Sequence, residues 1–377
     1  MKIGIVCYPT FGGSGVVATE LGMALADKGH EVHFITYNQP VRLDFLSHKL
    51  HFHQVLIEEY PLFQYQPYEL ALSSKMVEVV EKHQLEVLHV HYAIPHAYAA
   101  YMAKQMLLEK GIYVKVVTTL HGTDITLVGS HPTYKTAVEF SINNSDVVTA
   151  VSNNLKQTTN DLFNINKNIE VVYNFIDVEK YNKAEDEECK RNALAKPNER
   201  ILTHISNFRP VKRVEDVIKV FYEVQKEIPS KLLMIGEGPD RKKAEILTKK
   251  LGISNKVFFL GNSTEIDKIL CYSDVFLLPS QTESFGLAAL EAMAAKTAVI
   301  STNTGGLPEV NIHGQTGYLS NLGDVNDMAK NAISILKDNY VLERFKLNAK
   351  EHTKKFSLQN ILPVYEDIYK SCYKNRV

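Results

Sequence analysis

Short apolar runs alternate with segments of helical periodicity along most of the chain. In the first half the runs occupy residues 3–7, 31–36, 87–92, 114–121 and 146–152, and in the second half residues 201–206, 231–236, 256–261, 275–280 and 297–302. Nearly continuous apolar strands separated by helices are typical of parallel sheets that are covered on both faces. Each half therefore predicts a doubly wound, Rossmann-like α/β domain.

A polar, charged segment over residues 172–200 separates the two halves, and a new apolar run begins at Ile201. We therefore predict an N-terminal domain over residues 1–172 and a C-terminal domain over residues 173–356. Ligands of such sheets bind beyond the carboxyl ends of the strands, and two facing sheets imply a cleft between the domains. The residues that follow each strand are thus the candidates for function.

The composition excludes several classes of protein. With 377 residues, 45% of them hydrophobic, and a net charge of −1, the chain lacks the basic excess of a nucleic-acid-binding protein. No apolar run approaches the roughly 18 residues of a membrane span, and the N-terminus does not resemble a signal peptide. We therefore expect a cytoplasmic protein without stable membrane association. Its scattered cysteines lack CxxC spacing and are predicted to be reduced thiols: Cys7, Cys189, Cys271 and Cys372.

A glycine-rich loop follows the first predicted strand. Gly13 and Gly15 open a helix predicted over residues 16–28, whose N-terminal amides and dipole can hold an anion. The same residues fit a GxGxxA dinucleotide fingerprint, but that site needs an acidic residue at the end of the second strand. Residues 36–38 read TYN there. An anion other than a dinucleotide is therefore favoured, and a purely structural turn stays open.

Histidines gather at the predicted strand ends of the first half. His89 and His91 alternate on a strand and point the same way, with His96 nearby, but a third ligand at metal-binding spacing is not apparent. Core or cleft histidines are favoured over a metal site. His121 lies at a strand end beside Gly122, where it can exchange a hydrogen bond with a bound hydroxyl near neutral pH. A structural role for His121 is the open alternative.

Three loops of the second half predict a phosphate or diphosphate site. "SNFRPVKR" (206–213), "GEGPDRKK" (236–243) and "PSQTESFGLAALEAMAAK" (279–296) each follow a predicted strand. Together they bring cations, glycine amides and a helix N-terminus to one sheet edge, which suits such an anion. For the first loop alone, a solvated charged loop is an equal alternative.

Two glutamates, Glu283 and Glu291, flank the start of a strong helix-forming segment that Phe285 and Gly286 mark. Glu283 is predicted in the loop before the helix and Glu291 about two turns into it. Carboxylates are poor partners for phosphate, so they should face hydroxyls. A nucleotide sugar carries hydroxyls on both sides of a diphosphate and fits this arrangement. The alternative is a capping glutamate and a surface glutamate.

In this order along the chain, "GEGP", "ESFGLAALE", "GGLPEV" and "HGQTGYL", with a lysine-bearing loop before them, resemble the retaining GT-B glycosyltransferases of family 4. The resemblance covers essentially the whole chain. The N-terminal 36 residues, "HVHYAIPHAYAAYMA" and "TTLHGTDITLVG" are more similar still to the branch that serves bacillithiol biosynthesis. It implies transfer of N-acetylglucosamine from UDP-N-acetylglucosamine to the hydroxyl of L-malate, with retention and without a metal. It also implies that a C-terminal helix, about residues 357–377, packs back on the N-terminal domain.

On this resemblance, the C-terminal domain binds the UDP-sugar and the N-terminal domain binds the acceptor. Glu283 would contact the donor sugar, Lys212 would stabilise the leaving UDP, and His121 would lie near both substrates. Glu291 would hold the ribose hydroxyls. The other implied donor-binding residues are Gly13, Asn207, Arg209, Gly236, Gly238, Phe285, Gly286 and Leu287.

One position departs from the family pattern. The family usually has an arginine five residues before the lysine, where this chain has Asn207, and Arg209 lies three residues before Lys212. We expect Arg209 to help bind the phosphates, with a different role for Asn207 as the alternative.

The acceptor side is less specific in the sequence. L-malate is a small dianion and needs hydrogen-bond donors, for which the candidates are Ser14, Tyr92, Thr119 and Asn154. Each could instead be a turn or core hydrogen-bonding residue. A lipid or polysaccharide acceptor is the alternative substrate, and a non-enzymatic sugar-nucleotide-binding module is the alternative class. A homo-oligomer is left open.

Overall fold

The computed structural model describes residues 1–377 except 11, 45–46, 58–64, 182–190, 192–193 and 375–377. The chain divides into two compact units. Unit 1 comprises Met1–Asn174 and Gln359–Val377, and unit 2 comprises Phe175–Leu358. The first boundary lies inside the polar segment that interrupts the apolar pattern.

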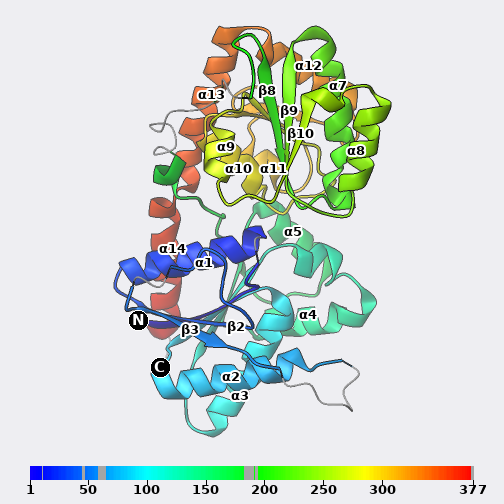
Figure 1. Cartoon of the computed structure of the whole chain (residues 1–377). Helices are drawn as coiled ribbons and strands as arrows, with labels where there is room; N and C mark the ends of the chain where they lie inside the picture. The colour runs from blue at the N-terminus through cyan, green and yellow to red at the C-terminus, as the bar shows by residue number, and fades with distance from the viewer. Residues whose placement is uncertain (11, 45–46, 58–64, 182–190, 192–193, 375–377) are drawn as a thin grey trace. The chain divides into compact units, whose positions relative to one another are not determined.

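Unit 1 is built on a parallel seven-stranded sheet of order β3-β2-β1-β4-β5-β6-β7. Its strands are β1 (Lys2–Val6), β2 (Glu31–Thr36), β3 (Leu50–Gln54), β4 (Val87–His91), β5 (Lys115–Leu120), β6 (Val147–Ala150) and β7 (Ile169–Val171). Its helices are α1 (Gly13–Asp27), α2 (Tyr68–His83), α3 (Tyr98–Glu109), α4 (Pro132–Asn144), α5 (Asn153–Leu162) and α14 (Leu358–Lys374). Figure 1 shows α1 and α14 on one face of this sheet and α2 and α3 on the other, as expected for a doubly wound domain.

Unit 2 repeats the plan with a parallel six-stranded sheet of order β10-β9-β8-β11-β12-β13. Its strands are β8 (Arg200–Ile205), β9 (Ser230–Ile235), β10 (Val257–Gly261), β11 (Val275–Leu278), β12 (Ala298–Thr302) and β13 (Gly317–Ser320). Its helices are α7 (Val214–Glu227), α8 (Arg241–Lys250), α9 (Ile266–Leu270), α10 (Leu287–Ala294), α11 (Leu307–Val310), α12 (Val325–Leu336) and α13 (Asn339–Thr353). The prediction of two doubly wound domains is confirmed.

The central strands of both sheets are buried along nearly their whole length, for example all of β4, β11 and β12. This explains why they appear in the sequence as almost unbroken apolar runs. Three strands lack such a run and were missed: β3, β7 and β13. β3 reads LHFHQ and is half-exposed at the sheet edge, so its pattern is mostly polar.

Because all strands of a parallel sheet run the same way, the loops after their carboxyl ends meet at one edge. In unit 1 this edge receives the start of α1 and the two short turns Ala93–Ala97 and Thr123–Leu127. In unit 2 it receives the loops that follow β8, β9, β11 and β12. Each edge is a candidate site, and each is described by itself.

Candidate functional site

An ion pair joins the two charged loops at the strand ends of unit 2. Lys212 Nζ donates to Glu283 Oε1 over 2.6 Å, and the side chains are 21% and 15% exposed. Ser280 Oγ donates to the same carboxylate oxygen over 2.8 Å. The loops are also tied through the backbone, since the Gln281 amide donates to the Val211 carbonyl. A lysine and a carboxylate are therefore held together while a part of each stays open to a ligand.

The glycines of "GEGP" are required by close packing between two loops. Gly236 has φ +119°, and a Cβ there would lie 1.8 Å from the Ser206 carbonyl oxygen. A Cβ on Gly238 would lie 2.0 Å from the Asn207 carbonyl oxygen. Only glycine fits at either position, so the loop after β9 packs in close backbone contact with the loop after β8.

The helix α10 begins after a left-handed turn. Gly286, its N-cap, has φ +101°, and a Cβ there would lie 2.6 Å from Leu307 Cδ2. The "GGLPEV" loop packs on the same turn: the Gly306 amide donates to the Glu283 carbonyl over 2.8 Å, and a Cβ on Gly305 would overlap that carbonyl. The two motifs thus form one packed unit around the start of α10.

The remaining donor-side residues fall into two groups. Phe285 is buried and meets Phe356 edge-on at 5.5 Å, and Leu287 is the first residue of α10. Glu291 is the fifth residue of that helix, one turn from its start rather than two, and is 9% exposed. Asn207 and Arg209 are both exposed, so either side chain is available to a ligand and the choice between them stays a prediction.

At the strand ends of unit 1, three candidate side chains come together. Ser14 Oγ and Tyr92 Oη are hydrogen-bonded at 2.6 Å, and Gly13 is the first residue of the helix that carries Ser14. Tyr92 has φ +94°, an unusual backbone conformation for a large side chain. The rings of Tyr92 and His121 lie 5.1 Å apart. The structure therefore joins residues after β1, β4 and β5.

His121 is paired with another buried histidine. Its Nε2 atom lies 2.8 Å from His91 Nδ1, and the two rings stack at 5.1 Å. Burial, with a smaller contribution from the charge of His96, lowers the pKa of His121 to about 3. His121 is therefore neutral near pH 7 and can exchange a hydrogen bond without carrying charge.

Asp124 is a residue of this site that the sequence reasoning did not single out. Its buried carboxylate accepts hydrogen bonds from the amides of Ala93 (2.8 Å), Gly122 (2.9 Å) and His121 (3.3 Å). It thereby joins the loop after β4 to the loop after β5. Burial raises its pKa to about 6 against the lowering effect of these amides. Its position three residues after His121, in "HGTD", is the feature of the sequence that could have indicated Asp124.

The Thr119 carbonyl accepts a hydrogen bond from the Tyr92 amide over 2.9 Å, but the side chain is engaged elsewhere, so its contact with the acceptor stays a prediction without support from the structure. Thr119 is 1% exposed, and its hydroxyl is bonded to His89 Nε2 (2.8 Å) and Thr149 Oγ1 (2.7 Å). His89 in turn bonds the Tyr369 hydroxyl of α14 at 2.7 Å. Thr119 therefore supports the packing of α14. Asn154 is exposed in the first turn of α5, and its role stays a prediction.

The metal alternative for the first-half histidines gains no support. In the part of the chain that the structure describes, His89, His91 and His96 do not offer three ligand atoms to one ion. Among the same residues, none of the helices is both long and apolar enough to cross a membrane.

Comparisons with known proteins cover nearly the whole chain. A family model described as Glycosyltransferase Family 4 matches residues 11–180, and one described as Glycosyl transferases group 1 matches residues 185–352. An N-acetyl-alpha-D-glucosaminyl L-malate synthase of Bacillus anthracis is 48% identical over 98% of this chain and 96% of its own length. An uncharacterized glycosyltransferase of Methanocaldococcus jannaschii is 24% identical over 96% of this chain and 97% of its own.

Solved structures show the same fold at low identity. A sucrose-phosphate synthase of Thermosynechococcus elongatus has a TM-score of 0.80 and 20% identity, with 99% of each chain covered. HepE of Anabaena, in complex with UDP and glucose, has a TM-score of 0.81 and 18% identity over 98% of this chain and all of that one. The fold is therefore GT-B, as the resemblance implied. With a relative of 48% identity over nearly its full length and two family models along it, the chain belongs to the family 4 glycosyltransferases and is a glycosyltransferase.

Proposed function

We propose that this glycosyltransferase moves N-acetylglucosamine from UDP-N-acetylglucosamine to the hydroxyl of L-malate, with retention at the anomeric carbon. The observation that carries the proposal is the 48% identity, over 98% of the chain, to a protein named as an N-acetyl-alpha-D-glucosaminyl L-malate synthase. The product would be N-acetyl-α-D-glucosaminyl L-malate, and the enzyme would catalyse the first step of bacillithiol biosynthesis.

The charged edge of unit 2 supports binding of the donor there. Lys212 is a half-buried cation at the strand ends, and its partner Glu283 is held by Ser280. When a diphosphate enters, the lysine can turn to it as a counter-ion, and Glu283 can accept hydrogen bonds from sugar hydroxyls. The turn before α10 adds helix amides of the kind that bind phosphate. Glu291, one turn on, is the proposed partner of the ribose.

The transfer itself needs little proton chemistry from the protein. The malate hydroxyl oxygen bonds to the anomeric carbon as the bond from that carbon to the phosphate oxygen breaks, and UDP leaves with the electron pair. We propose attack from the face that UDP leaves, with a phosphate oxygen of UDP taking the hydroxyl proton. Lys212 would stabilise the negative charge that develops on UDP. No metal is required in this proposal, because a lysine and backbone amides supply the positive potential.

The strand-end edge of unit 1 supports binding of the acceptor there. Ser14, Tyr92 and His121 lie together, and each can donate or accept a hydrogen bond. The start of α1 adds amide donors for a carboxylate of malate.

The test is UDP release from UDP-N-acetylglucosamine in the presence of a metal chelator, with L-malate, with succinate and without an acceptor. Succinate is the matched control because it keeps both carboxylates and lacks the hydroxyl. We expect release with L-malate alone, and an α-linked product by nuclear magnetic resonance. Release only with another acceptor would reject malate and leave the glycosyltransferase in place. Malate-dependent release that stops with the chelator would reject the metal-free mechanism.

A further inference from the structure

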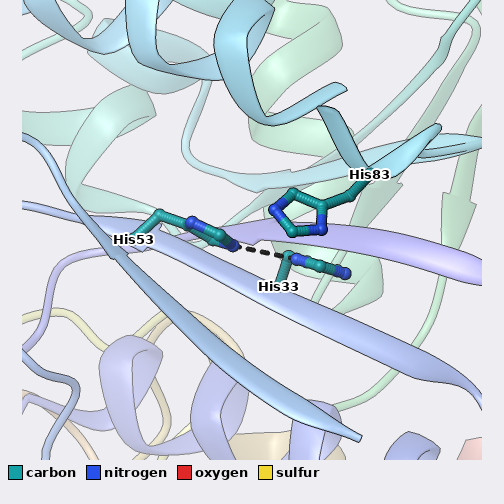
Figure 2. Close-up of side chains that lie close together, drawn as sticks. All are labelled: His33, His53 and His83. Carbon is teal, nitrogen blue, oxygen red and sulfur yellow. Dashed lines mark hydrogen bonds between the residues drawn. The ribbon is translucent and has the colours of Figure 1, made fainter. Parts of the chain in front are cut away.

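A second group of histidines in unit 1 lies away from the residues discussed so far. His33 on β2, His53 on β3 and His83 at the end of α2 each offer one ligand atom, and these three atoms lie within 4.8 Å of one another. Figure 2 shows the three imidazoles arriving from two neighbouring strands and from the helix end, and facing one another. The sheet register explains the meeting: His53 is opposite Ile35, which points to the same face as His33.

The ring nitrogens are arranged as a metal would require. His33 Nδ1 lies 2.9 Å from His53 Nε2. A tetrahedral zinc ion with Zn–N bonds of about 2.0–2.1 Å holds its nitrogen ligands about 3.3 Å apart. The two rings therefore need to separate by only a few tenths of an ångström to admit the ion between them.

A carboxylate fixes the tautomer of the central histidine. Glu31 Oε1 lies 3.1 Å from His33 Nε2, and as a carboxylate it can only accept, so this nitrogen carries the proton. The lone pair of His33 is then on Nδ1, the atom that faces His53. Histidine ligands of metals commonly donate their other nitrogen to a carboxylate in this way. Because Glu31 orients His33 in this way, the contact between His33 and His53 is more than aromatic stacking.

The third histidine has a nitrogen without a partner. Among the residues that the structure describes, no hydrogen-bonding group contacts the buried His83 Nε2 atom. A buried, unpaired polar atom is costly, and a bound ion would satisfy it. The ring of His83 lies 4.5 Å from that of His33 and 5.1 Å from that of His53. His51 is stacked on His33 at 4.5 Å and, with Glu31 and His33, forms a second group of neighbouring ligand atoms.

From this geometry we propose that His33, His53 and His83 bind one divalent transition-metal ion, with Glu31 orienting His33. Imidazole ligands in tetrahedral arrangement suit zinc, which is the probe we choose. The cluster lies at edge strand β3 and its neighbour β2, on the sheet face that α2 covers, where Ile35 packs with α2 residues and His33 points the same way. Ser14, Tyr92 and His121 follow the carboxyl ends. The ion would therefore tie edge strand β3 to β2 and α2 and take no part in transfer.

The test uses the full chain without an affinity tag, stripped of metal with a chelator and dialysed. Zinc is titrated by calorimetry, and cobalt(II) is added separately to read the ligand geometry from its visible absorption. We expect one zinc ion per chain, a tetrahedral cobalt spectrum without thiolate bands, and a higher unfolding temperature with zinc. Magnesium should have none of these effects.

Variants make the test specific. His53→Gln and His83→Gln, both half-exposed, are each expected to weaken zinc binding at least about 100-fold, and Glu31→Gln about 10- to 100-fold. His48→Gln, an exposed histidine outside the cluster, is the matched control and should bind zinc as the parent does. Circular dichroism checks that each variant is folded. The absence of one-to-one zinc binding, or equal zinc affinity in the parent and both folded ligand variants, would overturn the proposal. Loss of malate transfer would leave it standing, since binding is read without turnover.

Discussion

The strand-end edges of the two units follow one parallel topology but differ in the charged groups they carry. In unit 2 the edge holds a charged pair, Lys212 and Glu283, whose side chains are partly open to solvent. In unit 1 it holds the stacked pair His91 and His121, which burial keeps neutral. The same parallel sheet can therefore present either a partly exposed ion pair or a buried pair of neutral histidines beside a carboxylate that backbone amides hold.

The difference suits two different tasks. Negative charge develops on the diphosphate as UDP leaves, and a nearby cation stabilises that charge. A lysine on a partly exposed loop provides such a cation. A small acceptor needs its hydroxyl held in one orientation, and a rigid network anchored by Asp124 provides that. Substitutions at the two edges should therefore affect the leaving group and the acceptor separately.

The largest effect is expected from removal of the cation. Lys212→Ala should lower kcat about 10²- to 10³-fold, because the charge on leaving UDP loses its stabilisation. The measurement is malate-dependent UDP release. Lys219→Ala is the control, since Lys219 pairs with Asp216 at 3.1 Å on α7 and is 50% exposed. Near-parental turnover of Lys212→Ala would remove the distinction between the two edges.

The next effect concerns the shape of the charged edge. Gly236→Ala places a Cβ 1.8 Å from the Ser206 carbonyl and should reduce the free energy of unfolding by about 3 kcal/mol. Gly252→Ala is the matched control, because Gly252 also has positive φ but no atom lies within 4 Å of its added Cβ. It should cost only about 1 kcal/mol. Chemical denaturation measures both, and equal losses would show that close loop packing is unimportant.

Acid should weaken unit 1 more than unit 2. Burial lowers the pKa of His89 and His121 to about 3, so the unfolded state binds more protons than the native state between about pH 6.5 and pH 3. Stability therefore falls as the pH drops through this window, by about 2 kcal/mol per histidine at pH 5. Protonation of Asp124, whose pKa burial raises to about 6, offsets part of this loss. In unit 2, burial lowers the pKa of His204 to about 4 and also lowers the pKa of His352.

Peptide-resolved hydrogen exchange at pH 7.5 and pH 5, corrected for intrinsic rates, separates the units. Protection should fall further in β4 and β5 than in β8 and β11. Equal loss in the two sheets would contradict the description of the unit 1 histidines as buried and neutral.

The smallest effect probes the acceptor edge. Tyr92→Phe removes the 2.6 Å hydrogen bond to Ser14, and a neutral hydrogen bond is worth about 1 kcal/mol. We expect the KM for L-malate to rise about 5-fold while the KM for UDP-N-acetylglucosamine is unchanged. Tyr134→Phe, at an exposed tyrosine, is the control. A change confined to the donor KM would reverse the assignment of the two edges.

Much of the fold could be predicted because buried parallel strands are visible as local apolar runs. Each of the ten runs used as a strand overlaps one in the structure, such as residues 31–36 with β2. The donor edge was also accessible, since its residues lie in short motifs. The reason for glycine at positions 236 and 238 is their close packing against the loop after β8, which only the structure reveals.

What the sequence could not reveal depends on contacts between distant segments. His33 and His53 lie in segments whose pairing is set by the parallel register of β2 and β3, and β3 itself has no apolar run. The partners of the Thr119 hydroxyl could not be predicted, because a strand-end threonine looks the same in sequence whether it faces a ligand or a helix. Its actual partners include His89, which bonds Tyr369 some 280 residues away.

The chain enters and leaves unit 2 at neighbouring points. Ile176 donates its amide to the Phe356 carbonyl and accepts from the Leu358 amide. Unit 2 therefore ends in the chain where α14 begins, whereas unit 1 lacks the helix that covers His89 until α14 has been made. The half of the molecule that is made first must finish folding last. Until α14 docks, His89 and Thr119 of unit 1 lack their cover, so a chain without α14 would expose unit 1 to proteases more than unit 2.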